Sequence, residues 1–346
     1  MSLPKVTIQI VTWNSLKYLP FVLESIFNQT YRDFQVLVID NNSQDETVDF
    51  IRKNYPEVTV FKNKKNLGFA KANNQGIRLL HSPCIILCNQ DIVLENNWLE
   101  IIMSKVESDD YEDVGSFGGK LLKLKPSNGE IDQTSKTNTI DSCGLKINRH
   151  RRITEIGAGE DSGKFNEDRE VFGCSGALVL YRRDLLEDCL IKTKNNPQGE
   201  YFDEDFISYK EDVDLAWRAR ILGWKSMFIS SAIAYHVRSV SGSENNVLVE
   251  IIKNRKKQSS LAKYYSYRNH FLLLIKNEFT RNFFHDFWQI KWFEVKKAAY
   301  IFIFEVKNIK AWLAVLVLLP KMLAKRKEIF KKAKVDYGQM SNWLKK

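Results

Sequence analysis

Short β-rich runs alternate with helical patterns over the first hundred residues, and this alternation limits the possible folds more than any other feature. The runs are "VTIQIVTW", "FQVLVID", "VTVFKN" and "CIILCNQD", and helical patterns cover residues 18–28, about 45–54 and 70–81 between them. Strands that alternate with helices of about 10–15 residues are typical of βαβ units and a parallel sheet. The sequence therefore predicts an α/β domain.

The pattern changes after this first part of the chain. Residues 126–170 are polar, with short β segments such as "RRITEIGAG", which predicts an insertion or an antiparallel flap. Two more strands are expected in "GCSGALVLY" and "KSMFISSAIAYHV". Between them an acidic loop leads into a helix with Val213, Trp217 and either Ile221 or Leu222 at helical spacing. The polar stretch "RSVSGSENN" then predicts a boundary between a first domain, residues 1–240, and a second, residues 241–346.

The positive charge of the chain is concentrated in its last third. The 346 residues have a net charge of +10, but residues 246–346 carry 22 Lys and Arg against 7 Asp and Glu, which leaves the first 245 residues at −5. Such an asymmetry is typical of a chain of which one part meets an anionic surface, either nucleic acid or membrane. A first domain that is itself acidic does not favour nucleic acid.

The C-terminal region is rich in aromatic residues and lysines. Its purely apolar runs, residues 298–304 and 311–319, are shorter than the ~18–20 residues that a membrane-spanning helix needs. Basic faces beside Trp, Phe and Leu favour helices that lie in the surface of an anionic membrane. The alternative is a pair of amphipathic helices packed on their own domain.

The cysteines and the N-terminus bear on the cellular compartment. The five cysteines are scattered, and two of them fall within the apolar run of "CIILCNQD", so neither a disulfide framework nor a zinc site is expected. The first residues, "MSLPKVTIQIVTW", form a strand pattern and not a secretory signal. We therefore expect a protein of the reducing cytoplasm.

Polar residues follow the second predicted strand. "VIDNNSQDET" ends a buried strand on Asp40, and Asn41, Asn42 and Ser43 come next. Open parallel sheets bind ligands outside the carboxyl ends of their strands, and a fixed carboxylate there can accept from the imide N–H of uracil or thymine. The same residues also suit an Asx-rich turn in which Ser43 or Asp45 caps the next helix.

Two further stretches suit a phosphate and a cation. In "NLGFAKANNQGI", Gly68 permits a close backbone approach at a helix start, where N–H groups can face phosphate, although the glycines do not make the dinucleotide-binding fingerprint. "CNQD" places Asp91 at a strand end. Mg2+ and Mn2+ prefer oxygen ligands, often one or two carboxylates together with substrate phosphates, so Asp91 is a candidate ligand for a cation on a diphosphate.

A cluster of acids begins the helix of "YKEDVDLAWRARILGW". It places three acids, Glu211, Asp212 and Asp214, within four residues. Acids in a first turn complement the helix dipole, and Asp214 can pair with Arg218 one turn later. These effects explain one or two of the acids and leave Asp212 as a candidate general base.

Seven stretches, taken in order, resemble family 2 glycosyltransferases of the GT-A fold, and most of all the bacterial rhamnosyltransferase-type branch. They are "TWN", "VIDNNSQDET", "NLGFAKANNQGI", "CNQD", "GCSGALVLYRR", "YKEDVDLAWRARILGW" and "AYHVRS". The resemblance implies a Rossmann-like mixed sheet flanked by helices, with a C-terminal helical extension. It also implies a cytoplasmic enzyme that moves a sugar from a nucleoside diphosphate to a hydroxyl and inverts the anomeric carbon.

The resemblance further implies roles for individual residues of the donor site. The base and ribose would be held by Thr12, Trp13, Asn14, Asp40 and Asn42. The nucleotide and sugar side of the cleft would be lined by Asn66, Gly68, Asn73 and Asn89.

The remaining implied roles concern the reaction itself. A divalent cation, Mg2+ or Mn2+, would be bound by Asp91 and His236, and Asp212 would take the proton from the acceptor hydroxyl. Arg268 or Arg238 would add positive charge near the leaving diphosphate. The expected donor is deoxythymidine-diphospho-rhamnose, and the expected acceptor is a lipid-linked or cell-surface glycan at the inner face of the membrane.

Two departures from the family pattern refine this expectation. Asn89 stands where many members carry the first Asp of Asp-x-Asp, so the site has one carboxylate fewer and a weaker hold on the cation. The Gln-x-x-Arg-Trp motif of processive members is missing, which favours the addition of one or a few sugars.

Two other functions stay open at the level of the sequence. A nucleotidyltransferase would need a glycine-rich phosphate loop directly after the first strand, where "TWNSLKYLP" has no glycine. A non-catalytic scaffold that uses its basic tail is the second alternative, since basic helices alone do not exclude it.

Overall fold

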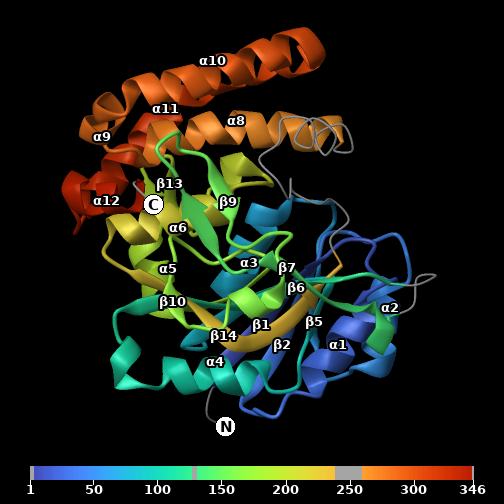
Figure 1. The fold of residues 1–346 in the computed structure, drawn as a ribbon. Helices are drawn as coiled ribbons and strands as arrows, with labels where there is room; N and C mark the ends of the chain where they lie inside the picture. The colour runs from blue at the N-terminus through green and yellow to red at the C-terminus, as the bar shows by residue number, and fades with distance from the viewer. Residues whose placement is uncertain (1–3, 127–130, 238–258, 345–346) are drawn as a thin grey trace.

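A ten-stranded mixed sheet forms the centre of the molecule in the computed structural model, which describes residues 4–126, 131–237 and 259–344 (Figure 1). One half of the sheet is parallel, in the order β3-β2-β1-β4. These strands are β1 (Val6–Thr12), β2 (Phe34–Asp40), β3 (Thr59–Lys62) and β4 (Cys84–Asn89). The predicted α/β architecture is confirmed.

The other half of the sheet begins with a reversal. β11 (Leu178–Arg182) runs antiparallel to β4 and to β6 (Val114–Leu124), and β14 (Lys225–His236) runs parallel to β6. Two reversals restore the direction of β4, so the carboxyl end of β14 lies at the same edge of the sheet as the ends of β1, β2 and β4. The short β5 (Ile92–Leu94) and β10 (Arg169–Glu170) pair with β14.

Helices cover both faces of this sheet. One face packs on α1 (Leu19–Phe27), α2 (Thr47–Asn54) and α4 (Trp98–Val106), and the other on α3 (Phe69–Leu79), α5 (Arg183–Cys189) and α6 (Glu211–Ile221). In β2, Val36 and Val38 enter the first core and Leu37 and Ile39 enter the second. Because both faces are covered, "FQVLVID" is apolar without alternation.

The predicted antiparallel flap is confirmed. After residue 130 the chain forms β7 (Lys136–Ser142), which pairs with β6, and a hairpin of β8 (Leu145–Ile147) and β9 (Ile153–Glu155). A second hairpin, β12 (Ile191–Thr193) and β13 (Asn196–Glu200), precedes α6.

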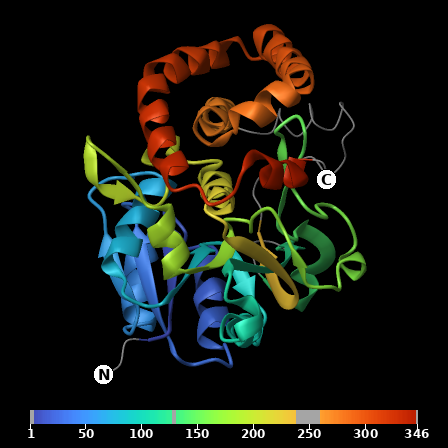
Figure 2. The same cartoon turned by 90° about the vertical axis from the view of Figure 1, so that its left-hand side faces the viewer.

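The C-terminal helices form a further layer on the far side of α6, and they lie together away from the N-terminus (Figures 1 and 2). They are α8 (Ser260–Asn277), α9 (Thr280–His285), α10 (Phe287–Phe304), α11 (Lys310–Lys331) and α12 (Tyr337–Leu344). Trp217 of α6 shares a core with Leu272 of α8 and Met322 of α11. This part of the alternative prediction, helices packed on their own domain, is thus realised by α8 and α11.

The boundary predicted at residue 240 lies outside the described residues, and the division into two domains stays a prediction. Within the described part of the chain, each helix is too short or too polar to span a bilayer.

Candidate active site

The strand ends that the sequence singled out lie next to each other. In the register of the parallel strands, Thr12 is the partner of Asp40, and Val11 is the partner of Asn89. His236 ends β14 and pairs with Ile92, directly after Asp91. The carboxyl edge of the sheet therefore brings these segments together.

Asp40 holds the turn between β2 and α2. Its carboxylate is fully buried and accepts from Thr12 Oγ1 at 3.0 Å, from Ser43 N at 2.9 Å and from Ser43 Oγ at 2.5 Å. Asp40 thus forms the turn at the strand end, but the predicted cap is realised only in part. Asp45 Oδ1 accepts from Thr47 N at 3.2 Å, whereas Ser43 bonds Asp40, and the N-cap residue of α2 is Glu46, which makes no side-chain cap bond. A role for Asp40 and Thr12 in base recognition stays a prediction.

The residues around this turn are more open to solvent. Trp13 is 54% exposed, and its backbone N–H donates to Gln90 Oε1 at 2.8 Å. Asn14, at φ 49°, donates its backbone N–H to Ser43 Oγ, and its side-chain oxygen accepts from Gln44 N. Asn42 also has a positive φ, 66°. The exposed indole suits the predicted stacking face.

Gly68 begins α3 beside this turn. Its φ of +82° is one that L-residues rarely adopt, and an added Cβ would lie 2.9 Å from Ile207 Cγ2. Asn66 Oδ1 accepts from Gly68 N at 2.9 Å, and Asn41 Nδ2 donates to Gly68 O at 3.3 Å. The Asn41 side chain therefore links the end of β2 to the start of α3.

Asn73 does not reach the strand ends. It is 1% exposed, its Nδ2 donates to Phe69 O at 3.0 Å, and its Oδ1 accepts from Gln9 Nε2 at 2.8 Å. Both polar atoms of the amide are used between α3 and β1, so the structure places Asn73 in the helix–sheet interface and not on a cleft wall.

Asp91, His236 and Asp141 form a carboxylate–imidazole–carboxylate group, which we call the open cluster. His236 Nε2 lies 3.4 Å from Asp91 Oδ1, and His236 Nδ1 lies 2.8 Å from Asp141 Oδ2. Asp91 keeps 20% of its side chain exposed, whereas Asp141 and His236 are buried. Asp141 is on β7, in the polar stretch for which we predicted no functional role.

The charges of the open cluster suit a cation. Burial by itself lowers the pKa of His236, but the hydrogen bonds to Asp141 and Asp91 and the charges of both carboxylates outweigh it and raise the pKa to about 9. At neutral pH the imidazole is thus protonated, and each ring nitrogen faces a carboxylate. A divalent cation would displace the Nε2 proton, while Nδ1–H keeps its bond to Asp141, an arrangement common for metal-binding histidines. The donor set of one imidazole nitrogen and one carboxylate oxygen therefore fits a divalent cation.

Asp212 lies at the same edge of the sheet. Its Oδ2 accepts from Gly176 N at 3.0 Å, and the next residue, Ala177, accepts from Asn89 N at 2.9 Å. A Cβ on Gly176 would lie 2.7 Å from Asp212 Cβ, so glycine permits this close approach. These contacts connect the candidate base to the end of β4.

Glu211, the residue before it, has a different protonation behaviour. Burial first, and then the charge of Asp212, raise the pKa of Glu211 to about 8. One buried oxygen of Glu211, Oε2, has no hydrogen-bond partner among the residues that the structure describes. At neutral pH Glu211 is thus largely protonated.

A second acidic group, which we call the closed cluster, is occupied by a lysine side chain. Glu200, Asp203 and Asp205 present oxygens within 4.8 Å of one another, a spacing that suits a metal ion. Lys325 Nζ, however, bonds Glu200, lies 2.5 Å from Asp203 Oδ1 and 2.7 Å from Asp205 Oδ2. Burial alone would lower the pKa of Lys325, but these carboxylates raise it, so its ammonium takes the cation position of this closed cluster.

Arg268 lies in the same region, at the back of the loop that precedes Asp212. It is 6% exposed, and its Nη2 donates to the backbone oxygens of Asp205 and Phe206. Its predicted role at the leaving diphosphate stays a prediction, and the other candidate, Arg238, lies outside the described residues.

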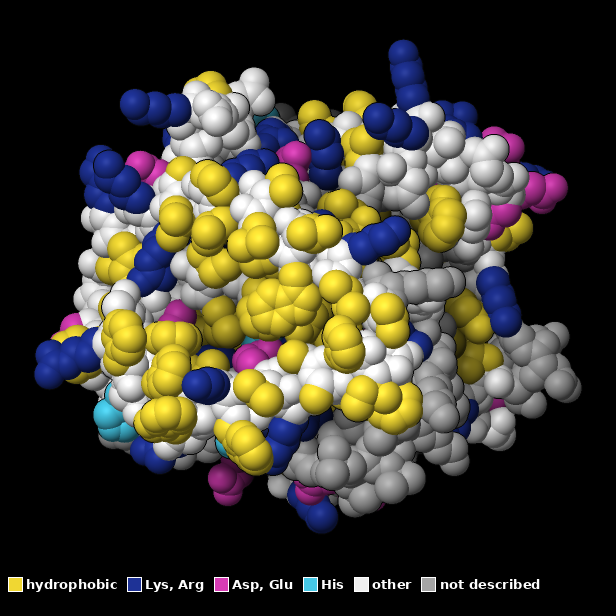
Figure 3. Space-filling model, turned by 90° about the horizontal axis from the view of Figure 1, so that it is seen from above, with side chains coloured by type: hydrophobic (Ala, Val, Ile, Leu, Met, Phe, Trp, Pro, Cys, Tyr) yellow, Lys and Arg dark blue, Asp and Glu magenta, His cyan; other side chains and the backbone are white. Residues whose placement is uncertain are grey.

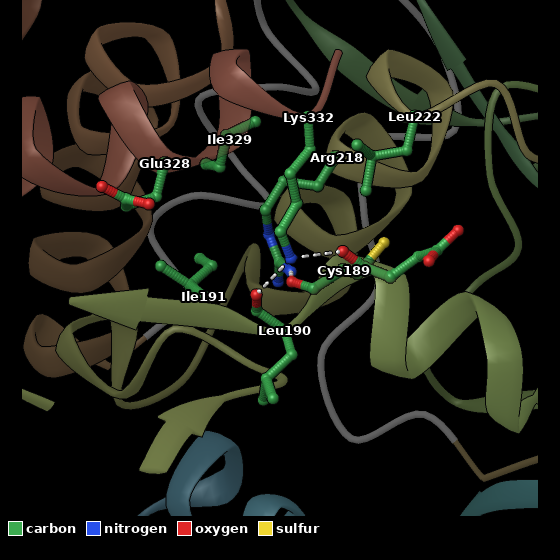
Figure 4. Close-up of a pocket in the computed structure, with 9 residues that line it drawn as sticks. Cys189, Leu190, Ile191, Arg218, Leu222, Glu328, Ile329 and Lys332 are labelled. Carbon is green, nitrogen blue, oxygen red and sulfur yellow. Dashed lines mark hydrogen bonds between the residues drawn. The ribbon is translucent and has the colours of Figure 1, made fainter. Parts of the chain in front are cut away.

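A small pocket lies away from the strand ends, between α11 and the β12 segment (Figure 4). Its volume of about 10 Å³ is room for a single water. Lys332 Nζ donates to Asp188 O and Leu190 O, each at 3.1 Å, so the polar groups that line it are already paired. The pocket is a packing seam and not a substrate site.

The family of the chain follows from its match to a family model. Residues 7–190, more than half of the chain, match the model described as "Glycosyl transferase family 2". The chain belongs to glycosyl transferase family 2. The predicted family is thus confirmed.

Two relatives match over most of this family 2 chain. It is 26% identical to the glycosyltransferase GlyG of Streptococcus pneumoniae, over 69% of this chain and 72% of the relative. It is 24% identical to an N-acetylglucosaminyl-diphospho-decaprenol L-rhamnosyltransferase of Mycobacterium tuberculosis, over 67% of this chain and 75% of the relative. Membership of the rhamnosyltransferase branch stays a prediction, which this second match supports.

Shorter matches reach higher identity. The chain is 31% identical to the uncharacterized glycosyltransferase YwdF of Bacillus subtilis over 31% of its own length, and the match spans 40% of that relative. The match to a Haemophilus influenzae glycosyltransferase likewise spans 43% of the relative. The chain thus spans less than half of the length of these two proteins.

Solved structures confirm the predicted GT-A fold of the chain. Staphylococcus aureus TarS 1–349 superposes with a TM-score of 0.55 and 15% identity, over 95% of this chain and 88% of that chain. GalNAc-T7, solved with UDP, GalNAc and Mn2+, has a TM-score of 0.56 and 14% identity, over 78% of this chain and 48% of that chain.

Proposed function

We propose that this protein is an inverting glycosyltransferase that transfers a sugar from a nucleoside diphosphate to a hydroxyl of a lipid-linked or cell-surface glycan. The observation that carries the proposal is the meeting of Asp91, His236 and Asp212 at the sheet edge where β1 and β2 end. Neighbours of the same fold have been solved with UDP and with UDP-GlcNAc. L-rhamnose is the proposed sugar, because of the rhamnosyltransferase relative.

The proposed base is Asp212. In-line attack on the anomeric carbon needs a base on the face opposite the leaving diphosphate. Asp212 is partly exposed, it is oriented by the backbone N–H groups of Gly176 and Val213, and its neighbour Glu211 holds a proton at neutral pH. Asp212 is therefore the accessible carboxylate of the pair, and it is the one that we assign to accept the proton of the acceptor hydroxyl.

The proposed cation ligands are Asp91 and His236. Asp141 orients the imidazole so that Nε2 is directed to the cation side. A divalent cation bound here would stabilise the negative charge that develops on the leaving diphosphate. Two neighbours of the same fold were solved with Mn2+, one of them with GDP-mannose.

The substitution Asp212→Asn tests this assignment. It keeps the size of the side chain but removes the base, so transfer should fall by roughly 10²–10⁴-fold. Donor affinity should stay within about threefold, because Asp212 faces the acceptor in this proposal. Asp184→Asn, at an exposed acid in the first turn of α5, is the matched control and should keep normal turnover. Near-normal transfer by Asp212→Asn would show that the base is another residue.

We further propose that the C-terminal helices attach the enzyme to the inner face of the cytoplasmic membrane. Large apolar side chains of α10 and α11 are strongly exposed, among them Trp288 at 73% and Val317 at 77%. Seen from above, apolar side chains gather on this side with Lys and Arg among them (Figure 3). Lys291 and Lys296 lie over the rings of Trp288 and Trp292, a combination that suits an anionic lipid surface.

Flotation with lipid vesicles tests the attachment. The double variant Trp288→Ser, Trp292→Ser should bind anionic phosphatidylglycerol vesicles about tenfold less, or weaker still, because two interfacial aromatic side chains are lost. Phe61→Ser, at an exposed position of β3, is the control and should bind as the wild type does. Equal flotation of the double variant and the wild type would contradict the proposal.

A further inference from the structure

The loop directly before Asp212 has an unusual backbone. Ile207, Tyr209 and Lys210 have φ values of 63°, 72° and 69°, in the region that L-residues rarely adopt. Ile207 is the most unusual of them, because a β-branched side chain at positive φ is a genuine outlier. Such conformations persist only where the surrounding structure enforces them.

One buried side chain of α8 bonds this loop at several points. Asn269 is 0% exposed, and its Nδ2 donates to the backbone oxygens of Phe206 at 2.9 Å, Ser208 at 3.0 Å and Tyr209 at 2.7 Å. Its Oδ1 accepts from Arg268 Nε at 3.0 Å, which fixes the orientation of the amide. The NH2 group of this one side chain therefore contacts three backbone carbonyls of the loop.

The opposite side of the loop rests on the start of α3. Ala70 N donates to Ile207 O at 3.2 Å, and Gly68 leaves the space that the Ile207 side chain fills. The strained loop is therefore held between Gly68, on the proposed donor side, and Asn269, on α8. The next turn of the chain carries Asp212.

We infer that Asn269 is a positioning residue, which holds the 207–210 loop in its strained form and thereby sets the place of Asp212 in the active site. The inference rests on the proposed role of Asp212 as the base. It goes beyond that role because it makes α8, at residues 268 and 269, part of the reaction's geometry although neither side chain needs to touch a substrate. The Asn269 amide acts through the backbone alone.

Two measurements on the full chain test this inference with Asn269→Ala. Hydrogen–deuterium exchange should be at least about tenfold faster at the amide of Ala70, whose acceptor is Ile207 O, and at the amide of Asp214, whose acceptor is Lys210 O. In the transfer reaction, kcat should fall by about 10–100-fold while the donor KM changes by less than about threefold. Asn282→Ala is the matched control, since Asn282 is a buried asparagine of α9 whose amide donates to Tyr337 O, far along the chain from the loop.

The outcomes separate the inference from the proposed function. Unchanged exchange at Ala70 and Asp214 overturns the inference even if the wild type transfers sugar. Faster exchange with unchanged kcat also overturns it, because the loop would then not set the reaction. If Asn269→Ala does not fold, Asn269→Ser, which is smaller but keeps one donor, replaces it with the same expected direction. A wild type that binds no sugar nucleotide refutes the proposed function, whereas the exchange result would still report on the loop.

Discussion

Two acidic clusters of this molecule are built from similar groups and have opposite properties. The open cluster, Asp91, His236 and Asp141, lies at the carboxyl edge of the sheet and has one carboxylate partly exposed. The closed cluster, Glu200, Asp203 and Asp205, has the tighter spacing of oxygens but holds Lys325 at its centre. Carboxylate spacing alone therefore does not identify a cation site, because a buried ammonium can occupy it.

The two clusters also differ in what they hold in place. The closed cluster ties α8 and α11 to the rest of the molecule, since Lys276 of α8 bonds Asp203 and lies 2.8 Å from Asp214 Oδ1. The open cluster joins the turn between β4 and β5, through Asp91, to β7 and β14. The closed cluster therefore holds helices in place, and the open cluster is the proposed cation site.

The largest expected effect comes from removing the ammonium group of Lys325 from the closed cluster. Lys325→Met keeps the length of the side chain but leaves three carboxylates without their common partner, so unfolding should become easier by about 3–5 kcal/mol. Urea denaturation measures this change. Mn2+ or Ca2+ should restore part of the lost stability, because the three carboxylates would then present a vacant site. Wild-type stability in Lys325→Met would contradict the view that the closed cluster depends on its buried lysine.

The second effect concerns the open cluster. Asp91→Asn removes its partly exposed carboxylate, so transfer at saturating donor should fall by roughly 10²–10³-fold as the cation's stabilisation of the leaving group is lost. The free energy of unfolding should change by less than about 1 kcal/mol, since the side chain is partly exposed. Initial rates measured over a series of Mn2+ concentrations give the first quantity. Full activity without any added or bound cation would contradict the assignment.

A smaller effect is expected for Asp141, which contacts the proposed cation ligand His236. Asp141→Asn keeps a hydrogen-bonding partner for His236 Nδ1 but removes its charge, so cation affinity should fall by about 10–100-fold. Isothermal titration with Mn2+ in the presence of a nucleoside diphosphate measures it. Unchanged affinity would mean that His236 is not oriented by Asp141.

The smallest effect is expected for Lys321, an exposed lysine at the edge of the closed cluster. Lys321 also contacts Asp205, at 2.7 Å, but half of its side chain is exposed. Because exposed ion pairs contribute little, Lys321→Met should cost at most about 1 kcal/mol of unfolding free energy. A cost as large as that of Lys325→Met would show that the number of charges matters and burial does not.

The sequence predicts the fold better than the hydrogen bonds and ion pairs of the site. The alternation of apolar runs and helices gives the parallel half of the sheet, and the positions of Asp40, Asp91 and His236 at strand ends are readable from the pattern alone. Asp141 and Lys325 are not, because each meets its partner through a contact distant in sequence, 95 and 122 residues away. Asn269 lies in the predicted helical pattern of the C-terminal region, yet only the three carbonyls beside it reveal a role.

Asn73 and Asp40 are two residues whose positions were predicted but whose hydrogen-bond partners were not. A pattern places both residues near the site, but periodicity does not reveal that the amide of Asn73 is used by Gln9 and Phe69, or that Thr12 and Ser43 bond the carboxylate of Asp40. Hydrogen-bond partners depend on tertiary packing, which a single sequence does not display.

The most direct test of the central claim is a thermal-shift panel of nucleoside diphosphates and sugar nucleotides, with and without Mn2+, on the wild type and on Asp91→Asn. A ligand at ~100 times its Kd stabilises the native state by about 2.7 kcal/mol, which is easily seen. We expect at least one nucleoside diphosphate to raise the Tm of the wild type in a Mn2+-dependent manner, and Asp91→Asn to lose the Mn2+-dependent part. If no nucleotide stabilises the wild type, the proposed nucleotide-sugar site is contradicted. If Asp91→Asn responds to Mn2+ as the wild type does, the proposed role of Asp91 as a cation ligand is contradicted.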